Sequence, residues 1–135
     1  MRFVTLILLV AFVSAAFAQT GAGGKKSVKE AQAATQQVSD AKLKLLESAY
    51  KSAKADFAKK PKDAKVKKAY VNATFAVGMG RMYSVSLPPR QKYTTALDAF
   101  REVLKTDPNH KEAKANHDMI VKIYKDMGRP VPGGN

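Results

Sequence analysis

Four stretches of this sequence carry apolar residues at steps of three and four, and prolines or a proline-rich linker separate them. Such steps return to the same side of an α-helix, whereas a half-buried strand needs alternation at every second residue. No run of strand length alternates in that way, apart from an ambiguous piece at 83–87. The pattern therefore predicts an all-α fold.

The predicted helices end near Pro61, at the linker 84–90, before Pro108 and at Gly128, because proline and glycine interrupt helices. The third helix is expected over 91–106. Their apolar stripes, in chain order, are Leu43, Leu46, Tyr50, Ala53 and Phe57; Val66, Tyr70, Ala73, Val77 and Gly80; Tyr93, Ala96, Leu97, Phe100, Val103 and Leu104; and Ala113, Asn116, Ile120, Ile123 and Met127.

The first residues have the pattern of an export signal. Arg2 is followed by an apolar run at 3–13, and Ala16-Phe17-Ala18 has the small-x-small spacing that a signal peptidase recognises. The run is shorter than the ~20 residues of a membrane span, which favours a cleaved signal over an anchor. We expect residues 1–18 to be removed before Gln19 and the mature protein to be periplasmic or secreted.

The rest of the chain divides by composition. Residues 19–38 begin rich in glycine and contain a capping-box spacing at Ser27 and Glu30, which predicts a flexible leader or a weak capping helix. Two further caps are expected, from Asp63 and Asn109. The remaining predicted units are a helical domain over 39–130, its hairpins 39–85 and 89–128, and a disordered tail over 129–135.

The sequence also repeats internally. A shift of 47 residues brings Pro61 onto Pro108, and one further residue brings Met79-Gly80-Arg81 onto Met127-Gly128-Arg129. Each half then consists of a helix, a proline break and a second helix. A short break favours antiparallel neighbours, so the sequence predicts two α-hairpins that stack on one another.

Ala96, Phe100, Val103 and Pro108 occupy spacings that resemble the second helix and closing proline of a tetratricopeptide repeat. The shift of 47 exceeds the ~34 residues of that family, and its Leu-Gly pair is absent, so the chain is similar to a short, degenerate member. The resemblance implies a non-enzymatic adaptor that binds a protein or peptide. It places the groove on Lys67, Tyr70, Thr74, Lys114, His117 and Val121.

Two hairpins are fewer than the three or so repeats that such a stack usually needs. We therefore expect either an end cap formed by residues 27–38 or self-association of the chain.

Positive charge is concentrated in the first half. Lysine and arginine number 24 against 11 acidic residues, and ten lysines but only three acidic residues lie between 42 and 68. The densest group lies around Pro61: Lys59, Lys60, Lys62, Lys65, Lys67 and Lys68. This group is either a solubilising face or a patch for anionic envelope polymers or lipid head groups. Nucleic acid is a poor candidate, because the aromatic residues fall on apolar stripes and cannot stack on bases.

Few residues suggest catalysis. The chain contains no cysteine, which excludes disulfides, thiolate zinc sites and thiol nucleophiles. His110 and His117 lie two helical turns, or about 10 Å, apart, too far to share a metal at ligand distances of about 2 Å. Gly78 and Gly80 follow no strand, which argues against a phosphate-binding loop. We expect no catalytic residue, metal or cofactor.

Overall fold

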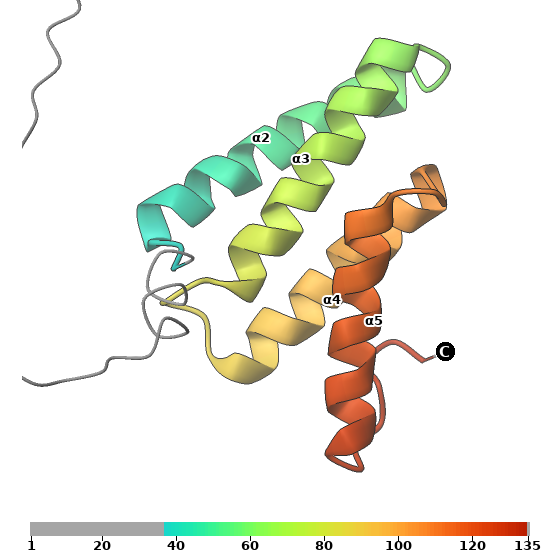
Figure 1. Ribbon diagram of the computed structural model, residues 1–135. Coiled ribbons are helices and arrows are strands. Elements are labelled where there is room, and N and C mark those ends of the chain that lie inside the picture. Colours follow the sequence, from blue (N-terminus) through green and yellow to red (C-terminus); the bar gives the residue numbers. More distant parts are fainter. Residues whose placement is uncertain (1–36, 135) are drawn as a thin grey trace, which may run out of the picture.

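The computed structural model describes residues 37–134, which form four helices (Figure 1). They are α2 (Asp40–Lys59), α3 (Ala64–Met82), α4 (Pro89–Thr106) and α5 (Lys111–Asp126). This part of the chain contains no strand, so the predicted all-α class is confirmed. Within it, no helix combines the length and the apolar character that a membrane crossing requires. The predicted signal peptide 1–18 and all but the last two residues of the leader 19–38 lie outside the described residues.

Local chemistry explains where the helices begin. Ser39 and Asp63 cap α2 and α3 with side-chain oxygens, and Asp63 Oδ1 accepts from the amides of Lys65 at 2.8 Å and Val66 at 3.1 Å. The first residue of α4 is Pro89, two residues before the predicted start, because proline suits a first turn whose amide needs no partner.

The cap of α5 differs from the prediction. Asn109 was expected to fill this position, but His110 does so, and its Nδ1 accepts from the amide of Ala113 at 3.2 Å. Histidine is not among the residues that usually cap helices, so the sequence pattern pointed to its neighbour.

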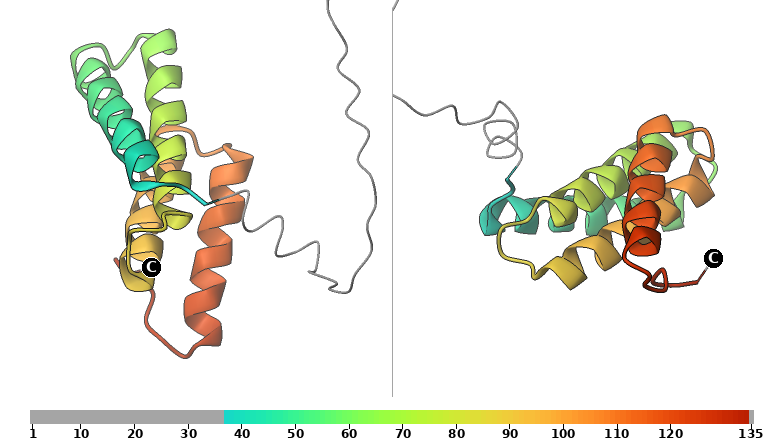
Figure 2. Two further views of the ribbon diagram at one scale, coloured as in Figure 1. Left: turned by 90° about the vertical axis from the view of Figure 1, so that its left-hand side faces the viewer. Right: turned by 60° about the horizontal axis from the view of Figure 1, so that its bottom comes forward.

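The helices pack in chain order, α2 against α3, α3 against α4 and α4 against α5 (Figures 1 and 2). The predicted stacking of two hairpins is therefore confirmed. Since α3 has neighbours on two sides, it buries more than the single stripe that the sequence predicted. Its buried residues are Tyr70, Val71, Thr74, Val77, Gly78, Gly80 and Met82.

The core centres on α4. Leu97, Phe100 and Val103 have no exposed surface, and Ile120 closes the core from α5. The small Ala96 and Ala99 are also buried on this helix. Large residues interleaved with small ones allow the neighbouring helices to approach closely.

The linker between the hairpins is tied to the start of α2. Val38 donates its amide to the carbonyl of Tyr83 at 2.9 Å, and Val85 donates to the carbonyl of Val38 at 3.0 Å. The fully buried Ser84 accepts at Oγ from the amides of Ser86 and Leu87, each at 3.2 Å. The ambiguous piece at 83–87 is thus a loop that makes one strand-like pairing.

The tail after α5 was expected to be disordered over 129–135, but residues 129–134 are anchored to the helices; Asn135 lies outside the described residues. The Arg101 guanidinium donates to the carbonyls of Pro132 at 2.6 Å and Gly134 at 2.9 Å. Val131 packs against the core. The chain turns back at Gly128, whose φ of 63° is a conformation that glycine adopts readily. Only the tertiary contacts with Arg101 and the core reveal this order.

Candidate functional site

The strongest concentration of charge lies where α2 turns into α3. We call this surface the basic bend; it consists of Lys59, Lys60, Lys62, Lys65, Lys67 and Lys68, all of them exposed. The end of α2, the short turn after it and the first turns of α3 supply the six side chains. The six lysines predicted as a patch from the sequence therefore lie at the bend that joins α2 to α3, at one end of this helical hairpin (Figure 1).

No lysine of the basic bend pairs with a carboxylate of residues 37–134, although lysines elsewhere do. Lys54 pairs with Glu102 at 2.8 Å, and Lys122 with Asp126 at 2.6 Å. Within the bend, Asp63 accepts hydrogen bonds from the first amides of α3. The positive charge of the basic bend is thus available to a partner.

A cleft of about 480 Å³ adjoins the basic bend. Lys67 and Lys68 contribute from α3, and Asp107 and His110 contribute from the turn between α4 and α5. The His110 ring lies against Phe75, with ring centroids 4.8 Å apart. Lys67, which belongs to both sets of residues predicted from the sequence, therefore lines a cleft of mixed charge.

Two of the predicted groove residues do not reach the surface. Tyr70 is 5% exposed and stacks on Phe57 with ring centroids 4.6 Å apart, and Thr74 is fully buried. Thr74 Oγ1 donates to the Tyr70 carbonyl at 2.7 Å. Both were placed on the inner wall of a groove by resemblance, but α2 and α4 cover α3 on both sides, so neither can contact a peptide.

The other three predicted groove residues lie on α5. Lys114 is exposed and pairs with Asp118 at 3.5 Å, while Val121 packs against the core. His117 Nδ1 lies 2.9 Å from Asp118 Oδ1. This hydrogen bond, with the nearby Lys114 charge, lowers the pKa of Asp118 although slight burial opposes the shift.

Glu102 forms a polar cluster that the sequence did not indicate. Its carboxylate on α4 accepts from Tyr50 of α2 at 2.8 Å, from Tyr70 of α3, and from Lys54 of α2 at 2.8 Å. The sequence pattern placed both tyrosines on apolar stripes and did not single out Glu102. The partners are 32 to 52 residues apart, so no local pattern could have brought them together.

The electrostatics of this cluster favour a structural role. Burial would raise the pKa of Glu102, but hydrogen bonds from Lys54, Tyr70 and Tyr50 together hold it below its usual value. Burial and the hydrogen bond to Glu102 raise the pKa of Tyr70 well above that of a free tyrosine. The carboxylate therefore stays ionised and the phenol stays protonated near neutral pH, whereas a general base or acid needs a pKa close to the working pH.

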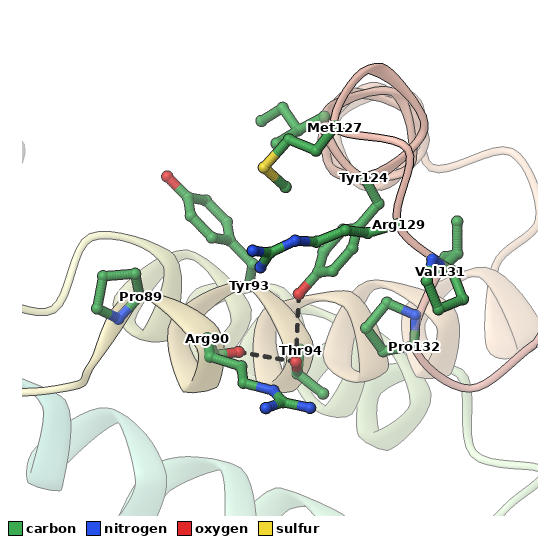
Figure 3. Close-up of a pocket in the computed structure, with 11 residues that line it drawn as sticks. Pro89, Arg90, Tyr93, Thr94, Tyr124, Met127, Arg129, Val131 and Pro132 are labelled. Atoms are coloured by element: carbon green, nitrogen blue, oxygen red, sulfur yellow. Dashed lines mark hydrogen bonds between the residues drawn. The ribbon is translucent and has the colours of Figure 1, made fainter.

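A second, larger cavity lies away from the basic bend, between the start of α4, the end of α5 and the anchored tail (Figure 3). We call it the C-terminal groove. Its volume is about 850 Å³, and its lining consists of Pro89, Arg90, Tyr93, Thr94, Ile123, Tyr124, Met127, Arg129, Pro130, Val131 and Pro132. Of the six groove residues predicted from the sequence, only Lys67 lines either cavity.

Within residues 37–134 no three potential metal ligands of the histidine, cysteine or carboxylate type lie together. His110 is used as a helix cap, and His117 contacts Asp118 on its own helix.

No protein-family model, curated protein or solved structure matches this chain. The functional argument therefore depends on the geometry and charge of the surfaces described above.

Proposed function

We propose that this chain is an exported, non-enzymatic binding protein that holds an anionic partner on the basic bend. The observation that carries the proposal is the group of six exposed lysines at one end of a packed hairpin, none of them paired with a carboxylate of residues 37–134. The export signal expected at residues 1–18 makes an anionic polymer of the cell envelope or a layer of lipid head groups the accessible partner.

The chemistry of lysine suits such a partner. Each ammonium group is a compact charge on a flexible stem, which attracts phosphate or carboxylate groups without requiring a fixed geometry. Several such charges together raise the local concentration of a polyanion and speed its encounter. The attraction is screened at physiological salt over a distance of about 8 Å, so binding through the basic bend should weaken steeply with salt.

The geometry favours this function over a peptide-binding adaptor with the groove predicted from the sequence. Tyr70 and Thr74 are buried, so that groove loses its central residues. Kinship with tetratricopeptide repeats is a separate proposal. The stacked hairpins support it, as does the complete burial of Ala96, Phe100 and Val103, which the resemblance assigns to helix contacts.

Binding to anionic vesicles tests the proposed function. The chain from Gln19 onward is mixed with phosphatidylglycerol vesicles and, separately, with soluble polyphosphate, at low and at physiological salt. We expect binding to both probes at low salt, marked weakening as salt rises, and no binding to phosphatidylcholine vesicles.

A pair of charge-matched variants locates the interaction. Lys62→Gln/Lys65→Gln/Lys68→Gln removes half of the basic bend, whereas Lys42→Gln/Lys51→Gln/Lys125→Gln removes the same charge from exposed, unpaired positions elsewhere in residues 37–134. The first variant should lose most of the affinity and the second little. Equal losses would mean that net charge alone governs binding, and salt-independent binding would also contradict the proposal.

A further inference from the structure

The C-terminal groove has the size of a small-molecule site. Its volume of about 850 Å³ lies within the range of 300 to 1,000 Å³ typical of pockets for a single small ligand. Its walls come from the first turns of α4, the last turns of α5 and the tail 129–132. This volume favours a small ligand.

Part of the lining is apolar and accessible. Met127 is 52% exposed, and the half-buried Ile123 and Val131 also line the groove. Binding of a ligand that removes apolar surface from water is favoured by about 25 cal/mol for each Å² buried. Methionine is also flexible and adapts its shape to different apolar groups. The groove therefore suits a ligand with an apolar body.

The charged part of the lining is entirely positive. Arg90 and Arg129 line the groove, no carboxylate does, and neither arginine forms an ion pair within residues 37–134. In Figure 3 the Arg129 side chain extends toward Tyr93, while the Arg90 guanidinium lies near Thr94. Guanidinium groups bind carboxylates and phosphates through paired hydrogen bonds. An anionic head group would thus meet a complementary charge at the groove.

The tail wall is held in place before any ligand arrives. The two hydrogen bonds from Arg101 fix the carbonyls of Pro132 and Gly134. The rings of Pro130 and Pro132 also restrict the backbone of the tail after α5. The Tyr124 hydroxyl lies 3.5 Å from Thr94 Oγ1 across the floor (Figure 3). A groove that is already formed costs its ligand less ordering on binding.

We propose that the C-terminal groove binds a small amphiphilic anion, with the apolar chain against Met127, Ile123 and Val131 and the carboxylate or phosphate head at Arg129 and Arg90. The site is separate from the basic bend, so it neither requires nor repeats the function proposed for that surface.

Titration with single-chain amphiphiles tests this site. Dodecanoate and dodecyl phosphate are added below their critical micelle concentrations and followed by calorimetry and by amide chemical shifts. Both should bind near one equivalent and shift the amides of the groove. Dodecyltrimethylammonium shares the chain but reverses the charge, and acetate has the charge without the chain; neither should bind. The tighter of the two anions identifies the preferred head group.

Variants decide whether binding occurs in the groove. Arg90→Gln/Arg129→Gln should weaken dodecanoate binding by roughly tenfold or more. A tenfold change in Kd corresponds to about 1.4 kcal/mol of binding free energy. Met127→Glu should weaken it as well, by placing a carboxylate in the lining. Lys125→Gln near the end of α5 removes one positive charge outside the lining and should leave the affinity unchanged.

Three outcomes would overturn the proposal. They are equal affinity for dodecyltrimethylammonium, undiminished affinity in Arg90→Gln/Arg129→Gln, and loss of dodecanoate binding in the basic-bend variant Lys62→Gln/Lys65→Gln/Lys68→Gln. The last result would assign the amphiphile to the basic bend and would leave the function proposed for that surface standing.

Discussion

Gly78 on α3 lies directly against the Phe100 ring on α4, so that a methyl group at Gly78 would come within 2.9 Å of Phe100 Cε1 and 3.1 Å of the Ala99 Cβ. Phe100 has no exposed surface and stands at the centre of the core. The contact between the two hairpins therefore depends on the absence of a side chain at position 78.

Gly78→Ala should destabilise the protein. Alanine favours a helix over glycine by about 1 kcal/mol, but overpacking a filled core typically costs about 1 to 3 kcal/mol. The buried Phe100 ring has little room to move, and the Ala99 Cβ is fixed by its bond to the backbone. We therefore expect a net loss of stability. Thermal or urea unfolding of the variant measures the change.

Gly80→Ala on the same helix is the matched comparison. Its new methyl would approach Leu46 Cδ1 at 2.6 Å, the far end of a half-buried and flexible side chain that can move aside. The gain in helix propensity should then offset most of the cost, leaving stability within about 1 kcal/mol of the parent. An equal loss for both variants would contradict the packing argument.

Removal of the Glu102 carboxylate should loosen the contact among three helices. Glu102→Ala leaves the Tyr50 and Tyr70 hydroxyls and the Lys54 ammonium without their shared acceptor, at a cost of about 1 to 3 kcal/mol. Chemical denaturation at neutral pH measures this loss. A variant as stable as the parent would show that water replaces the carboxylate without penalty.

The Glu102 carboxylate should also make the free energy of unfolding depend on pH. Since folding lowers the pKa of Glu102 below its usual 4.5, its contribution is present above pH 4.5 and is lost as the pH falls through the folded-state value. The free energy of unfolding should therefore fall more steeply below pH 4.5 in the parent than in Glu102→Gln, which cannot titrate. Parallel acid profiles would exclude this residue as a source of the dependence.

The histidine cap of α5 predicts a further effect on stability. His110→Ala removes the acceptor for the Ala113 amide and the contact with Phe75, and should cost about 1 kcal/mol or somewhat more. His110→Asp restores a strong cap with a favourable charge at a helix N-terminus and should recover part of that loss. If Asn109→Ala proves the more damaging change, the cap belongs to Asn109 as the sequence pattern had suggested.

The helices themselves followed from local features of the chain. The stripe containing Phe100 and Val103 and the break at Pro108 predict a helix end near Thr106, where α4 does end, because helix periodicity and proline act over a few residues. The lysines around Pro61 are likewise neighbours in sequence, so their position at one bend needed no long-range contact.

Tertiary packing decided the rest. α3 lies between two helices, which buries Tyr70 and Thr74 and removes the groove that a one-sided helix would present. The Glu102 cluster, the tail anchored by Arg101 and the C-terminal groove each join segments about 30 or more residues apart. Local periodicity specifies which side of a helix is apolar, whereas the number of neighbours that cover that helix depends on how the whole chain packs.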